Sequence, residues 1–193
     1  MQKCCFLLGM ILLCLASCSL SGDRAAPASE YAPVATIKDI MDSMVDPSAD
    51  FVWNSVGVEI TAEGTVERAP KTDEEWKEER RRVILLVEAA NLLISPERKV
   101  AKPGEKAENP EIELAPEELE SMIKETRKTF LRLAKEFQTT GIDLLAATDK
   151  RDLEAISRLG AELDTRCENC HKTYWYPKDP VFKNDPKETD KDK

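Results

Sequence analysis

Two cysteines and the only histidine of the chain lie within five consecutive residues, Cys167-Glu168-Asn169-Cys170-His171. In this C-x-x-C-H pattern, two thiols can form thioether bonds to a porphyrin while the neighbouring imidazole takes one axial position on its iron. The pattern therefore predicts one covalently bound haem c on Cys167 and Cys170, with His171 as the proximal iron ligand.

Two other kinds of site could use the same residues. A structural zinc site needs four protein ligands, and two cysteines with one histidine complete that set only with carboxylates. A thioredoxin-like redox pair needs the motif at the start of a helix that follows a strand. This motif instead ends a long helical stretch, so haem attachment is the favoured interpretation.

The N-terminal segment has the pattern of an export signal. Lys3 precedes an apolar run, residues 5–15, which is too short to span a membrane. The run ends in Leu15-Ala16-Ser17-Cys18, which resembles a bacterial lipobox. We expect residues 1–17 to be a lipoprotein signal peptide and Cys18 to carry the lipid. The alternative is ordinary cleavage that leaves Cys18 as a free thiol.

The expected anchor places the mature chain on the periplasmic side of a membrane, the outer membrane in preference to the inner. Residues 18–33 are rich in Ser, Ala and Pro without apolar periodicity, which predicts a flexible tether. Loss of the signal peptide would leave Cys167 and Cys170 as the only cysteines beyond the anchor, the number that covalent haem consumes.

The charge balance restricts the class of partner. Without residues 1–17 the chain has 27 basic and 37 acidic residues, a formal charge of −10. Nucleic acid is therefore excluded as an expected partner. An acidic exported electron carrier would be steered toward a redox partner protein with a basic docking patch. A homodimer is left open.

Apolar residues at helical spacing predict four amphipathic helices. The first begins after Val34 and is interrupted at Pro47, and its apolar stripe is Ile37, Ile40, Met41, Met44 and Val45. The second begins at a capping box of Thr72 and Glu75 and stops at Pro96. Residues 56–67, around Gly64, are compatible with a short hairpin.

The third helix begins at Pro116 and is expected to run to about Thr148. Asp149 would cap the fourth, which carries the haem motif and ends at Pro177. Residues 96–115, between the second and third helices, form a long polar connection, either a crossover or a mobile loop. Residues 178–193 alternate Lys, Asp and Pro and are expected to be a disordered charged tail.

These elements predict an all-α fold, an antiparallel four-helix bundle over residues 34–177 with haem near the C-terminal end of the last helix. The organisation resembles class II cytochromes c, the cytochrome c′ and cytochrome c-556 superfamily. The haem motif followed by Tyr174-Trp175-Tyr176-Pro177 carries the resemblance, with weaker support from residues 40–47, 70–76 and 88–93.

The resemblance implies periplasmic electron transfer or binding of a diatomic gas such as NO or CO. In the register that ends at Met41, Ile37 stands where the superfamily commonly has an arginine, and Lys38 is only a weak substitute for pairing with the haem propionates.

The sixth iron position decides between the two functions. No methionine follows His171, so a second ligand must come from upstream. We expect Met41 as the distal iron ligand, because its position matches the distal site of the cytochrome c-556 branch, with Met44 as the alternative. An empty sixth position would favour gas binding. No catalytic residue is expected, because the single histidine is assigned to iron and leaves no base for a nucleophile. Slow peroxidase-like chemistry at an open iron is the third choice.

Overall fold

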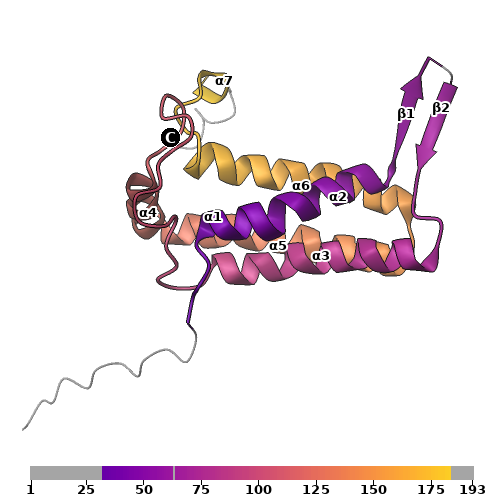
Figure 1. The fold of residues 1–193 in the computed structure, drawn as a ribbon, viewed down its shortest axis with the longest axis horizontal. Helices are drawn as coiled ribbons and strands as arrows, with labels where there is room; N and C mark the ends of the chain where they lie inside the picture. The colour runs from indigo at the N-terminus through magenta and orange to yellow at the C-terminus, as the bar shows by residue number, and fades with distance from the viewer. Residues whose placement is uncertain (1–31, 63, 184–193) are drawn as a thin grey trace, which may run out of the picture. The chain divides into compact units, whose positions relative to one another are not determined.

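The structure is a computed structural model that describes residues 32–62 and 64–183. The expected signal peptide, the lipidated Cys18, most of the tether and residues 184–193 lie outside the described residues. The elements in chain order are α1 (Ile37–Ile40), the π-helix η1 (Met41–Val45), α2 (Asp46–Ser55), β1 (Gly57–Thr61), β2 (Gly64–Arg68), α3 (Asp73–Leu93), α4 (Pro116–Glu125), α5 (Arg127–Asp149), α6 (Leu153–Tyr174) and α7 (Pro180–Lys183) (Figure 1).

The described chain is mostly helical, with one antiparallel two-stranded sheet. The sheet is the hairpin considered for the residues around Gly64, with Gly57 opposite Arg68 and Thr61 opposite Gly64. It projects from the helices between α2 and α3 (Figure 1). No helix of the described segments combines the length and the apolarity that crossing a membrane requires.

The sequence predicts that the first helix is interrupted at Pro47, and this prediction is wrong. The chain is helical from Ile37 to Ser55, and the irregularity lies earlier, in the π-helix η1. A proline ring clashes with the carbonyl four residues before it, here that of Ser43. In η1 the Asp46 N–H bonds to the Met41 carbonyl, five residues back. This wider turn accommodates Pro47 without ending the helix.

The start of α3 follows the expected capping box. The Thr72 hydroxyl accepts a hydrogen bond from the Glu75 N–H, and the Glu75 carboxylate accepts one from the Thr72 N–H at 2.8 Å. Farther along, α3 packs closely against α5. A Cβ atom on Gly141 of α5 would lie 3.0 Å from Cγ2 of Val87, so the glycine permits this close approach.

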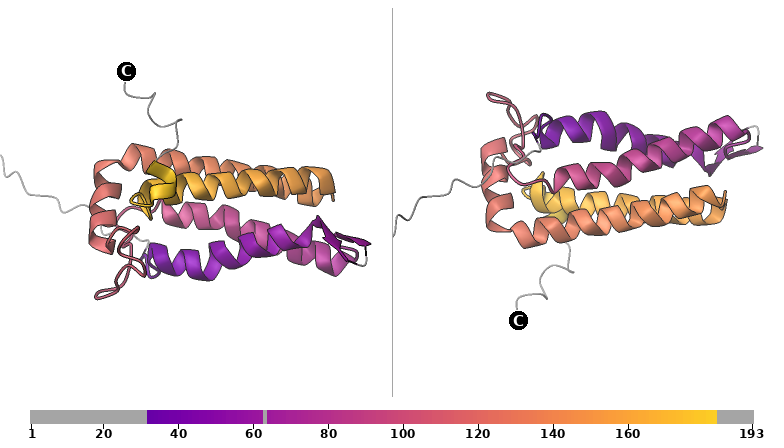
Figure 2. Two further views of the ribbon diagram at one scale, coloured as in Figure 1. Left: turned by 90° about the horizontal axis from the view of Figure 1, so that it is seen from above. Right: turned by 90° about the horizontal axis from the view of Figure 1, so that it is seen from below.

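The single helix expected from Pro116 to Thr148 is two helices. Thr126 has φ −109° and ψ 32°, which separates α4 from α5, and α4 lies across the end of the longer helices (Figure 2). The Thr126 hydroxyl bonds to the Met122 carbonyl at 2.7 Å and to the Tyr174 hydroxyl at 2.8 Å. The bend is thus fixed partly from α6, far away in sequence.

The fourth helix begins later than expected. Asp152 rather than Asp149 is its N-cap, and its carboxylate accepts a hydrogen bond from the Ala155 N–H at 3.0 Å. Asp149 instead forms an ion pair with Arg80. The helix ends at Tyr174, before Pro177. Within the expected disordered tail, Pro180–Lys183 form α7.

Residues 96–115 form a crossover at the end of the helices where α1 begins and α6 ends. The Ile37 N–H donates to the Lys99 carbonyl at 2.9 Å, and the Leu114 N–H donates to the Trp175 carbonyl at 2.9 Å. Val100 is buried. The crossover, which joins α3 to α4 along the chain, therefore also bonds to the start of α1 and to the end of α6.

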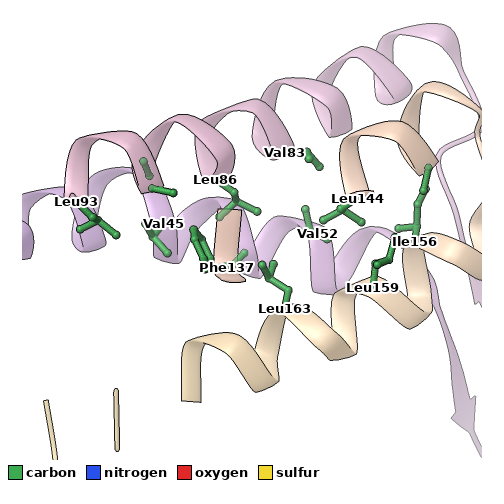
Figure 3. Packing of buried hydrophobic residues seen from close by; sticks show 14 of the residues in the cluster. Val45, Val52, Val83, Leu86, Leu93, Phe137, Leu144, Ile156, Leu159 and Leu163 are labelled. Carbon is green, nitrogen blue, oxygen red and sulfur yellow. The ribbon is translucent and has the colours of Figure 1, made fainter. Parts of the chain in front are cut away.

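The buried apolar side chains form two clusters. The larger one fills the space between α2, α3, α5 and α6, and Figure 3 shows its central members. The smaller one lies at the crossover end and consists of Val100, Ile123, Phe130, Leu133 and Tyr174. Ile37 contacts both clusters.

Candidate haem attachment site

The three residues of the C-x-x-C-H motif lie in α6, at positions i, i+3 and i+4, and therefore share one face of the helix. Cys167 packs against the larger apolar cluster, and Cys170 packs against the smaller one. The two thiols thus mark the junction between the clusters. A flat apolar group attached to both would lie along this junction.

The environment of the thiols keeps them protonated at neutral pH. Burial raises the pKa of Cys167 to about 12 and that of Cys170 to about 11. Neither cysteine is in a disulfide. Two neutral thiols in apolar surroundings do not form the low-pKa pair of a dithiol oxidoreductase. They suit bonding to an apolar ring.

His171 lies among aromatic side chains. Its ring centroid is 5.0 Å from that of Trp175 and 5.8 Å from that of Tyr176, in edge-to-face geometry. Burial lowers the pKa of His171, so the neutral imidazole that can ligate iron is favoured. Within the described residues neither ring nitrogen forms a hydrogen bond, which leaves a nitrogen free to bind iron.

The aromatic group beside His171 is itself held in place. The Tyr176 hydroxyl donates a hydrogen bond of 2.7 Å to the Glu168 carboxylate, one turn before His171 on the same helix. Burial raises the pKa of Tyr176, so the hydroxyl remains a donor. The contact fixes the chain after α6 around the imidazole.

Trp53 sets the register between α2 and α6. Its indole Nε1 donates a hydrogen bond of 3.0 Å to the Gly160 carbonyl. The two helices run in opposite directions (Figure 1). Met41 is twelve residues before Trp53, and His171 is eleven residues after Gly160. Met41 and His171 therefore lie on the same side of this contact, toward the end where α1 begins and α6 ends.

Both candidate distal methionines lie in the π-helix. Met41 and Met44 are partly buried and pack against the larger apolar cluster. The helical stretch that carries them is close to α6 at the C-terminal end of α2 and diverges from α6 toward α1 (Figures 1 and 2).

The charged groups near the start of α1 differ from those that the superfamily pattern implies. The Lys38 ammonium is 3.0 Å from Glu108 and 3.7 Å from Asp42. Arg98, which the sequence analysis did not single out, is buried and donates hydrogen bonds to the carbonyls of Leu92 and Ala35. The sequence carried no local signal for this contact, because its acceptors belong to two other segments.

The donor set fits a covalently attached haem. It consists of two free thiols at positions i and i+3 of α6, an imidazole on the same helix face, and two thioether sulfurs in η1 that pack against the larger apolar cluster. Among the described residues, no group of three or more His, Cys, Asp or Glu side chains could hold a metal ion.

No protein-family model, curated protein or solved structure matches the chain.

Proposed function

We propose that the chain is a class II-type cytochrome c that carries single electrons through one haem c. In this proposal the stretch Ile37–Ser55 with α3, α5 and α6 forms an antiparallel four-helix bundle around the haem. The observation that supports it most strongly is the position of Cys167, Cys170 and His171 on one face of α6, where the two thiols pack against the two apolar clusters. Bound haem supplies an iron that accepts and donates one electron.

Each side chain has a separate task in this account. Cys167 and Cys170 would hold the porphyrin through two thioether bonds, where the two apolar clusters meet. His171 presents a neutral nitrogen, oriented by Trp175 and Tyr176. Met41 would supply a thioether sulfur as the second iron ligand. Bound by both His171 and Met41, the iron would keep its coordination when it gains or loses an electron.

A second candidate function is the binding of a diatomic gas. It is favoured by one observation, the packing of Met41 and Met44 against the larger apolar cluster. If both sulfurs stay in that cluster, the side opposite His171 is lined by apolar groups and remains open to a small ligand.

Absorption spectra of the purified holoprotein test the proposal and separate the two functions. Acid–acetone extraction should leave the haem on the polypeptide. The electron-transfer account predicts low-spin spectra in both oxidation states and a reduced spectrum that changes little with carbon monoxide. A high-spin ferrous protein that binds carbon monoxide tightly favours gas binding, and complete extraction of the haem contradicts both.

We also propose that Cys18, which lies outside the described residues, anchors the chain to a membrane on its periplasmic side. The Leu15-Ala16-Ser17-Cys18 sequence supports this proposal, because two acyl chains provide stable anchoring that one chain does not. The wild type should sediment with membranes, and Cys18→Ser should release soluble holoprotein or block processing. Equal sedimentation of both would contradict the anchor.

A further inference from the structure

A hollow of about 360 Å³ lies along the seam between α2 and α6, on the outside of the larger apolar cluster. Its floor consists of the buried residues Val52, Ile156 and Gly160, and Ala161 and Asp164 lie on its α6 side. Trp53 is 36% exposed although its indole is tied to Gly160. We call this hollow the α2–α6 groove. It contains no residue of the haem attachment motif.

Aspartates that form no ion pair within the described part of the chain lie on both helices that form the groove, and we call Asp46, Asp50 and Asp164 its acidic rim. Asp46 and Asp50 of α2 are spaced four residues apart and share a helix face with Trp53, and α2 contains no Lys or Arg. Asp46, Asp50 and Asp164 form no ion pair with any described residue. In contrast, Arg158 and Arg166 of α6 are both paired with Glu162.

Electrostatic effects place this rim beside the attachment site. Burial raises the pKa of Asp46, and the charges of Asp42 and Asp50 raise it further. After burial and Cys170, the carboxylates of Asp164 and Asp46 are the next causes of the raised pKa of Cys167. Asp164 is also three residues before Cys167, one helical turn away. The groove therefore leads to the Cys167 side of the motif.

We propose that the α2–α6 groove docks a protein partner whose contact surface is an apolar side chain ringed by Lys and Arg. The proposal rests on the proposed function, because the partner is one that exchanges electrons with the haem. An apolar centre with a polar rim is the usual anatomy of a protein interface. Complementary charges on the rim raise the rate of encounter and fix its orientation. Asp164, at the near end of the groove, lies one helical turn from Cys167.

Stopped-flow kinetics with a lysine-rich redox protein test the docking site. The reduced holoprotein is mixed with ferric mitochondrial cytochrome c over a range of ionic strength. The first variant is the groove triple, Asp46→Asn with Asp50→Asn and Asp164→Asn. The matched control removes the same charge elsewhere on the surface, by Asp143→Asn with Glu125→Gln and Glu59→Gln, all at exposed positions.

A third variant, Ala161→Gln, narrows the groove without changing the charge. We expect the groove triple to lower the second-order rate constant at low salt by about tenfold and to flatten its salt dependence. The control triple should lower it by less than about threefold, and Ala161→Gln should lower it at every salt concentration. Equal loss in the two triples, or no effect of Ala161→Gln, would overturn the proposal.

Failure of the docking site can be distinguished from failure of the haem assignment. Spectra of each variant show before mixing whether haem is present, and titration calorimetry with the same probe measures binding without using the haem. A haem-free protein that still binds the probe through the groove contradicts only the proposed function. A concentration-dependent dimer of the wild type that Ala161→Gln abolishes would overturn the docking proposal, since a second copy would then occupy the groove.

Discussion

The indole nitrogen of Trp53 donates a hydrogen bond of 3.0 Å to the carbonyl of Gly160, and this contact fixes α2 against α6. The contact determines where α2 lies along α6. Because the chain is helical from Ile37 to Ser55, it also determines how far Met41 extends toward the end of α6 that carries His171. Trp53 is therefore a positioning residue for the candidate site, although it lies about three turns away from it.

Trp53→Phe keeps an aromatic ring and removes the hydrogen bond. We expect it to lower the free energy of unfolding by about 1 kcal/mol, the usual net value of one such bond. Urea unfolding of the holoprotein, followed by far-UV circular dichroism, measures the change. A loss below a few tenths of a kcal/mol would mean that packing alone sets the register.

The two methionines of the π-helix should respond differently to truncation. Met41→Ala should convert the iron to high-spin and open it to carbon monoxide, because it removes the ligand opposite His171. Met44→Ala should leave the spectrum low-spin and lower the free energy of unfolding by about 1–2 kcal/mol, below the range for a fully buried methionine, because Met44 is only partly buried. Absorption spectra and urea unfolding of both variants provide the check.

The opposite result for the two variants would identify Met44 as the distal ligand. If Met44→Ala opens the iron and Met41→Ala does not, the wider turn of η1 has presented the other sulfur. The distal ligand would then be Met44. If neither variant changes the spectrum, no methionine binds the iron.

Glu79 of α3 is fully buried, and neither oxygen of its carboxylate has a hydrogen-bond partner. The nearby Ser55 hydroxyl donates to the Val52 carbonyl instead. Burial raises the pKa of Glu79 above the ordinary value of 4.5. The folded state therefore favours the protonated acid.

The raised pKa of Glu79 makes the free energy of unfolding depend on pH. Below pH 4.5 both folded and unfolded chains hold the proton, so the contribution of Glu79 is fully present. As pH rises, the unfolded chain ionises first, and stability is lost until the folded pKa is passed. Glu79→Gln should therefore gain stability relative to the wild type between pH 4 and pH 7. Urea unfolding at both pH values measures it.

An apolar replacement at the same position gives an independent check. Glu79→Met should be more stable than the wild type at pH 7 by about 1–3 kcal/mol, because it removes an unpaired polar group from the core. A destabilised Glu79→Met, together with a pH-independent difference for Glu79→Gln, would show that the carboxylate is ionised and satisfied in the folded protein.

Local signals in the sequence predicted where several helices begin. They failed where contacts between distant residues determine the course of the chain. The capping box at Thr72 and the proline at the start of α4 act through neighbouring residues, so they could be recognised without the fold. The bend at Thr126 depends on the Tyr174 hydroxyl and on a hydrogen bond from Arg127 to the Ile94 carbonyl. Neither contact leaves a local pattern.

In the candidate site, too, local patterns were predicted and contacts between distant residues were not. The spacing of Cys167, Cys170 and His171 placed them on one helix face from the sequence alone, and the structure agrees. The π-helix that presents Met41 and Met44 was missed, because its five-residue hydrogen bonds have no apolar periodicity of their own. The hydrogen bond of Trp53 could not be predicted from the sequence, since its partner is a backbone carbonyl more than one hundred residues away.

The attachment of haem to Cys167 and Cys170 can be tested on a single peptide. Trypsin cleaves after Arg166 and Lys172, so the motif is released as the peptide Cys167–Lys172. Mass spectrometry of a digest of protein made with a working haem maturation system should find this peptide with the mass of one haem and with visible absorption. Recovery of the same peptide with both cysteines alkylated by iodoacetamide and no added haem would contradict the account.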